Sequence, residues 1–154
     1  MFAVLLHLVL CPVTTRKMNS SLALNGSVPT PSYVLLNEKT RISPTVVALQ
    51  SGRKCIALYG FSDKTPYDSF RSNSQIALTP FPLVKGYLQT LIDSVSEHLH
   101  LVIIDACGPN ETQVNAATME AVLAAQKSQV GTVVVEYTLA FNEESKSYQV
   151  VEPT

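Results

Sequence analysis

Apolar residues recur at three- and four-residue intervals in parts of the chain, and this spacing predicts helices. The longest helix is expected over Pro80–His98. Its expected buried stripe consists of Val84, Leu88, Leu91, Ile92 and Val95. A second long helix is predicted from Asn110, as its cap, to about Lys127, in a segment where alanine is frequent. A short helix is expected to begin at Thr65-Pro66 and to end near Ser72-Asn73, because threonine suits the cap and proline the first turn.

Shorter runs of apolar and β-branched residues predict strands. The expected strands are Tyr33–Leu36, Thr45–Gln50, Cys55–Tyr59, Gln75–Leu78, Leu99–Ile104, Thr132–Phe141 and Ser147–Val151. A turn at 51–53 joins the second and third strands into a hairpin, and a turn at 142–145 joins the last two. Leu99–Ile104 is expected at the centre of a sheet, because it shows no polar alternation beyond His100.

The order of these elements, β-β-β-α-β-α-β-α-β-β, predicts an α+β (mixed α/β) fold. We expect a single layer-type domain over residues 33–154, with a mixed sheet, about three helices and a C-terminal β-hairpin. A chain of 154 residues can bury a core of ordinary size, so the fold requires neither a metal ion nor a disulfide.

Residues 1–32 are expected to be a tail and a linker outside this domain. The apolar run Phe2–Leu10 is too short for a membrane-spanning helix, which needs about 20 residues. Arg16 and Lys17 follow the run, whereas a secretory signal carries its basic residues in front of it. We expect residues 1–17 to lie outside the natural fold, as a disordered tail or because translation starts at Met18. An export or anchoring signal is the alternative.

Composition narrows the class of protein. Hydrophobic residues make up 46% of the chain and charged residues 15%, against a typical charged share of about 25%, which excludes a disordered charged chain. The net charge is −1, so the chain lacks the excess of basic residues that is typical of a nucleic-acid-binding protein. The three cysteines, Cys11, Cys55 and Cys107, form no CxxC motif, which excludes a zinc ribbon and a redox dithiol and favours a reducing, cytoplasmic compartment.

One turn carries candidate thiol chemistry. Cys107-Gly108-Pro109-Asn110 follows an apolar strand and opens the second predicted long helix, and a cysteine at a helix N-terminus can have a lowered pKa. The tetrapeptide is similar to the first part of the thioredoxin active-site loop, but Asn110 stands where that loop has its second cysteine. The other interpretation is a turn that glycine and proline shape and asparagine caps. A thiol-dependent enzyme or redox protein using Cys107 is therefore the alternative function.

Four aromatic residues lie in or shortly before the short helix that is predicted to begin at Thr65-Pro66: Tyr59, Phe61, Tyr67 and Phe70. Either they pack this helix onto the preceding hairpin, or they form a partly exposed patch that binds a partner. Asp105 and Asn110, at the two ends of the 105–110 turn, complete the candidate binding residues. We expect no metal site and no cofactor, because no third ligand can be placed beside His98 and His100.

Together these elements resemble the N-terminal domain of the SseB family. The residues that carry the resemblance are Val46–Leu49, Ser51–Arg53, Ile56–Tyr59, Asp63, Phe70, Leu83–Ile92 and Val102–Asp105. The resemblance implies a small α/β domain without an assigned catalytic apparatus, and no catalytic residue is carried over. The leading prediction is a non-catalytic interaction or regulatory domain that acts through a protein surface. Its expected partner is another protein or a second copy, because a low surface charge favours association.

Overall fold

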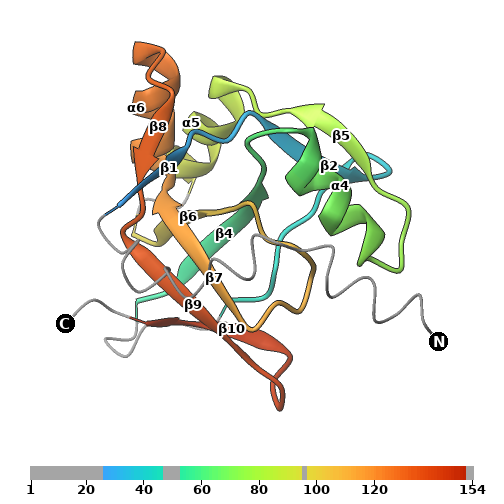
Figure 1. Cartoon of the computed structure of the whole chain (residues 1–154). Helices are drawn as coiled ribbons and strands as arrows, with labels where there is room; N and C mark the ends of the chain where they lie inside the picture. The colour runs from blue at the N-terminus through green and yellow to red at the C-terminus, as the bar shows by residue number, and fades with distance from the viewer. Residues whose placement is uncertain (1–25, 47–52, 95–96, 152–154) are drawn as a thin grey trace.

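Five strands form a central mixed sheet in the order β10-β9-β7-β6-β4 (Figure 1). They are β4 (Cys55–Gly60), β6 (Leu99–Ile104), β7 (Gln113–Thr118), β9 (Tyr137–Asn142) and β10 (Ser147–Val151). Strands β4 and β6 are parallel, and every other neighbouring pair in this sheet is antiparallel. This computed structural model describes residues 26–46, 53–94 and 97–151, and it confirms the predicted α+β class.

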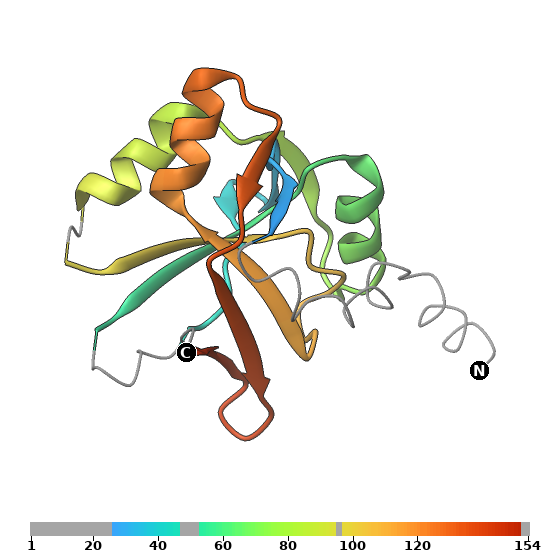
Figure 2. The ribbon, with the colours of Figure 1, turned by 60° about the vertical axis from the view of Figure 1, so that its left-hand side comes forward.

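Two smaller sheets and three helices surround the central sheet within the described residues. The remaining strands are β1 (Ser27–Pro29), β2 (Tyr33–Asn37), β3 (Thr40–Arg41), β5 (Thr79–Pro82) and β8 (Thr132–Val134). They pair in the orders β3-β2-β5 and β1-β8. The helices are α4 (Lys64–Ser72), α5 (Lys85–Ser94) and α6 (Met119–Ser128). Figure 2 shows α5 and α6 side by side, with α4 well apart from them.

Both faces of the central sheet are buried at β6, whereas Gln149 and Val151 of the edge strand β10 are exposed. All six residues of β6 are buried, as expected of a central strand. Successive β6 residues belong to two different apolar clusters, because side chains alternate between the faces of a sheet. Leu88 of α5 and Met119 of α6 lie in one cluster, whereas Phe70 of α4 and Tyr148 of β10 lie in the other.

Residues 33–46 connect the two edges of the central sheet. Isolated bridges pair Tyr33 with Phe61, directly after β4, and Val46 with Tyr148 of β10. Tyr59 and Tyr148 also line the same pocket and donate to carbonyl oxygens of the same turn, although β4 and β10 are the opposite edge strands. The sheet is therefore curled, and one face forms a hollow that the chain partly closes.

The prediction of a long helix from Asn110 to about Lys127 is wrong for the first half of that segment. Residues 113–118 form β7, and the helix α6 begins at Met119, with the Thr118 hydroxyl accepting from the N–H of Ala121. Alanine favours helices and is depleted in strands, so the propensity of this segment does not decide its structure. Here Val114 and Ala116 are buried in the sheet between β6 and β9, and this tertiary contact decides the strand.

Other boundaries also differ from those predicted. The Pro80–His98 segment begins as strand β5, and its helix starts at Lys85, whereas Gln75–Leu78 forms no strand. Cys55–Gly60 pairs in parallel with β6, while most of its predicted hairpin partner, 47–52, lies outside the described residues, as does Val95. The predicted strand 132–141 divides into β8 and β9, and the C-terminal hairpin is confirmed. Ser27–Pro29, within the predicted linker, pairs with β8.

Candidate functional site

A pocket of about 220 Å³ opens on the curled face of the central sheet. Its lining comes from widely separated parts of the chain: the segment after β3, the end of β4, α4 and the segment after it, the turn before β7, and the β9–β10 hairpin. The lining residues are Ile42, Ser43, Pro44, Thr45, Tyr59, Phe70, Ser74, Ile76, Leu78, Pro109, Asn110, Phe141, Lys146 and Tyr148. Most of these side chains are apolar, with polar groups concentrated near the opening.

Four aromatic rings from four elements pack together at this pocket. The ring centroids of Tyr59 and Phe70 are 4.7 Å apart, and those of Phe141 and Tyr148 are 5.2 Å apart in an edge-to-face arrangement. Phe141 and Tyr148 are direct cross-strand partners in the β9–β10 hairpin. Because the rings support one another from several elements, the apolar wall is held in place without a ligand.

The two tyrosine hydroxyls at the pocket are already hydrogen-bonded within the protein. The Tyr148 hydroxyl donates to the carbonyl oxygen of Glu111 at 2.6 Å, and the Tyr59 hydroxyl to that of Pro109 at 3.4 Å. Burial raises the pKa of both tyrosines above the usual value, so both phenols are neutral at pH 7. Their role here is to join the two edge strands and the turn before β7.

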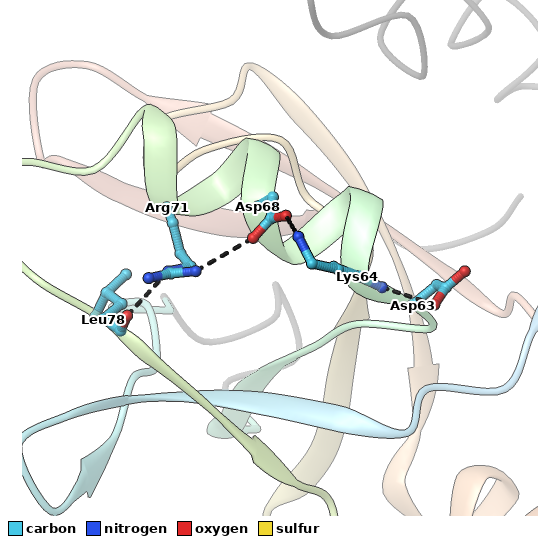
Figure 3. A network of polar contacts seen from close by, with 5 residues as sticks. All are labelled: Asp63, Lys64, Asp68, Arg71 and Leu78. Carbon is cyan, nitrogen blue, oxygen red and sulfur yellow. Dashed lines mark hydrogen bonds and ion pairs between the residues drawn. The ribbon is translucent and has the colours of Figure 1, made fainter.

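Helix α4 carries a polar network that holds one wall of the pocket (Figure 3). The Asp63 carboxylate accepts from the backbone N–H of Lys64 and caps the helix. Asp68 pairs with both Lys64 and Arg71 on the exposed side of α4. Arg71 also donates from Nε to the carbonyl oxygen of Leu78 at 2.9 Å. This last bond fixes the end of the segment 74–78, which lines the pocket.

A second contact ties the same region to the turn before β7. The Asn73 side-chain amide, at the C-cap of α4, donates to the carbonyl oxygen of Cys107 at 2.7 Å. The backbone N–H of Cys107 donates to the Glu111 carboxylate at 2.8 Å. The helix and the 107–111 turn are therefore bonded together on one side of the opening.

The rim of the pocket combines one exposed apolar side chain with polar groups. Ile76 is 49% exposed, although it lines the pocket. Asn110 and Lys146, which also line the pocket, are exposed, and the Lys146 ammonium pairs with Glu143 at 3.0 Å. An apolar interior with a polar rim is the arrangement that protein interfaces use around a central anchor.

The structure brings together three of the six predicted binding residues: Tyr59, Phe70 and Asn110 line the pocket. Phe61 is fully buried and packs edge-to-face on Phe70, so it supports the pocket from the core. Tyr67 is half-buried and contacts the ring of Tyr33. These aromatic residues pack α4 onto the sheet, which is one of the two predicted roles, and Tyr59 and Phe70 also line the pocket.

Asp105, a further predicted residue, lies away from the pocket. It follows β6 with a left-handed φ of 57°, which aspartate tolerates better than most residues. Its carboxylate accepts from the backbone N–H of Ser62 at 2.8 Å and from the Ser62 hydroxyl at 2.7 Å. Burial raises the pKa of Asp105, although both bonds from Ser62 oppose the shift. The residue joins the loops that follow the parallel strands β4 and β6.

No helix begins at the turn that holds Cys107, which corrects the basis of the thiol hypothesis. The turn 105–110 leads into strand β7, and α6 begins only at Met119. No helix dipole therefore acts on Cys107, which is 6% exposed. The free cysteine of the described residues is Cys55, and burial raises its pKa to about 12. The described residues also contain no group of three or more metal-ligating side chains.

Sequence reasoning missed the pocket residues contributed by the segment 42–45 and the C-terminal hairpin. A local signal existed in the hairpin, where the alternation and the turn at 142–145 place Phe141 opposite Tyr148. No local signal shows that this pair lies beside Tyr59, because that contact depends on the curl of the sheet.

The fold and the pocket define an α+β domain with an aromatic-lined pocket on the curled face of its central sheet. The chain matches no protein-family model, no curated protein and no solved structure. None of the helices in the described ranges has the length and apolar content needed to cross a membrane.

Proposed function

We propose that this domain is a non-catalytic interaction module that binds a partner protein by accepting one apolar side chain of that partner in the pocket. The observation that carries the proposal is the size of the pocket together with its lining. A cavity of about 150 Å³ lined by apolar residues holds one benzene molecule, whereas small-molecule sites span about 300–1,000 Å³. A pocket of about 220 Å³ has room for one aromatic or branched aliphatic group.

The polar chemistry of the pocket supports an apolar occupant. Both tyrosine hydroxyls donate to backbone carbonyls of the protein, so their protons are not available to a ligand without breaking these bonds. The wall consists mainly of rings and aliphatic groups, which gain free energy when an apolar side chain replaces water. The exposed Ile76 extends this apolar surface to the rim, where the partner's backbone would pass.

The proposal agrees with the resemblance to the SseB N-terminal domain, which implies a domain without catalytic apparatus. The cytoplasmic location remains a prediction from the cysteine pattern. A partner of neutral or mixed charge fits the chain best, because the net charge of −1 provides no strong attraction for either sign.

The test is an NMR titration of the full chain with N-acetyl-phenylalanine amide and N-acetyl-leucine amide, with N-acetyl-glutamine amide as the polar control. We expect the two apolar probes to shift the amide signals of pocket-lining residues, Asn110 and Lys146 among them, and the glutamine probe to leave them in place. Equal shifts with all three probes, or no shift at the pocket, would contradict the proposal.

A matched pair of variants localises the binding. Ile76→Asp places a charge at the rim of the pocket and should weaken binding of the phenylalanine probe about fivefold or more. Val84→Asp makes the same change at a side chain of similar exposure, 46% against 49%, that does not line this pocket. Binding by the Val84 variant should match that of the unmodified chain.

A further inference from the structure

Strand β8 has one edge that faces away from its partner β1. In the antiparallel pair, Val133 lies opposite Val28, and hydrogen bonds link Gly131 to Thr30 at 3.0 Å and Val135 to Gly26 at 2.9 Å. Backbone groups of an antiparallel strand alternate in direction. The N–H and C=O groups of Thr132 and Val134 therefore point outward, and no hydrogen bond to a described residue uses them.

This edge lacks the features that protect other strands in the described parts of the chain. Strand β5 carries Pro80 and Pro82, and strand β1 carries Pro29. The edge strand β10 is partly covered, because Val46 forms a bridge with Tyr148. Residues 130–135 of β8 and its flanks contain no charge and no proline. Edges without such protection are templates for pairing with another chain.

Exposed apolar side chains gather along the same edge. Val130 is 49% exposed and Val134 is 45% exposed, whereas Val133 between them is 5% exposed and belongs to the core cluster beneath. Thr132 is exposed as well. The strand therefore presents unpaired backbone groups and apolar side chains together, and no charged residue lies within 130–135.

We propose that β8 pairs in antiparallel register with β8 of a second copy of this chain, about a two-fold axis at Val133. This register sets Thr132 opposite Val134 of the partner subunit, and both residues direct their N–H and C=O groups toward that strand. The two residues of each such pair exchange two hydrogen bonds. The two-fold axis generates the same pair a second time, on the other side of Val133. The outward groups of β8 are thus complementary to themselves, and the product is a four-stranded sheet β1-β8-β8-β1.

The resulting dimer is weak and depends on concentration, because a three-residue strand contributes few hydrogen bonds and a small interface. The edge is separate from the pocket: Val130, Thr132 and Val134 do not line it. Loss of the dimer would leave binding of the apolar probes unchanged, so the two proposals fail independently.

Sedimentation equilibrium of the full chain over micromolar to millimolar concentrations provides the first measurement. We expect the average mass to rise from 16.7 kDa toward twice that value. In Val134→Pro, only the outward N–H is lost, so the internal pairing with β1 is kept and the mass should stay at 16.7 kDa throughout. The control Val134→Thr keeps the N–H and should still associate.

Amide hydrogen exchange of the unmodified chain tests the register without any variant. The amides of Thr132 and Val134 should gain protection as concentration rises, whereas the amide of Val133, which faces β1, should be protected at every concentration. A constant mass of 16.7 kDa, association of Val134→Pro equal to that of the unmodified chain, or unchanged exchange at Thr132 and Val134 would each overturn the proposal.

Discussion

The carboxylate of the half-buried Asp105 links the loops that follow β4 and β6. Partial burial of its negative charge lowers the stability of the folded protein. Its raised pKa means that the folded protein binds the proton more tightly than the unfolded chain does. The associated stabilisation is complete below the usual pKa of 3.8 and is lost as pH rises through the folded-state pKa. Above that range the charged carboxylate remains buried and is supported by the two bonds from Ser62.

Asp105→Asn should remove this pH dependence. Asparagine tolerates the φ of 57° and can bond to the same Ser62 groups, but it does not titrate. The free energy of unfolding of the variant, relative to the unmodified chain, should therefore increase as pH rises from about 4 to about 7. Urea unfolding across this range measures the difference, and a difference that is constant or falls with pH would show that the folded-state pKa is not raised.

His100 is a second residue whose burial has a measurable cost. The side chain is 2% exposed, and its Nε2 atom has no hydrogen-bond partner among the described residues. His100→Leu removes this buried polar atom and should raise the free energy of unfolding by about 1 kcal/mol. His98→Leu, at the half-buried position nearby, serves as the control and should change stability by less than about 0.5 kcal/mol. Marked destabilisation of the His100 variant would reveal a hydrogen bond that the imidazole makes in solution.

At the scale of elements, α4 matters because its C-terminal end holds a wall of the pocket. Arg71 and Lys64 both pair with Asp68, but only Arg71 also bonds to the carbonyl oxygen of Leu78 (Figure 3). The exposed ion pairs contribute little to stability by themselves. The bond to Leu78 fixes the segment in which Ile76 lies.

Arg71→Met and Lys64→Met separate these two contributions. Arg71→Met should lower the free energy of unfolding by about 1 kcal/mol and speed hydrogen exchange in the segment 74–78, because the carbonyl of Leu78 loses its donor. Lys64→Met removes only an exposed ion pair and should leave both quantities nearly unchanged. Equal effects of the two changes would show that the bond to Leu78 does not hold the wall.

At the scale of the whole molecule, the curl of the sheet brings its two edge strands together. The hydroxyls of Tyr59 on β4 and Tyr148 on β10 both donate to carbonyl oxygens of the turn before β7, those of Pro109 and Glu111. A contact between opposite edges of a five-stranded sheet constrains the shape of the whole sheet. The pocket exists because these edges converge.

A double-mutant cycle with Tyr59→Phe and Tyr148→Phe measures this closure. Tyr148→Phe should cost about 1 kcal/mol, because the carbonyl oxygen of Glu111 loses a donor at 2.6 Å. The two changes should be coupled by about 0.5 kcal/mol or more, since both hydroxyls bond to the same turn and line the same pocket. The pair Tyr148→Phe with Tyr67→Phe, whose rings lie in different contacts, should be additive. Additive effects in both cycles would mean that the two hydroxyls do not interact in solution.

The sequence by itself determined the α+β class, the central strand Leu99–Ile104 and the C-terminal hairpin. In the strand the run of apolar residues is strong, and in the hairpin the pairing partners are near in sequence. For the aromatic residues around α4 the sequence left packing and partner binding open, and the structure shows that Tyr59 and Phe70 are packed in the core and line the pocket.

Only the tertiary structure decided that Gln113–Thr118 is a strand, because pairing with β6 and β9 and burial between them override the helix propensity of alanine. The same holds for the pocket. Its walls come from segments far apart in the chain, and the free energy that brings them together is the burial of apolar surface between them. That burial depends on which residues meet in space, which no local spacing along the chain encodes.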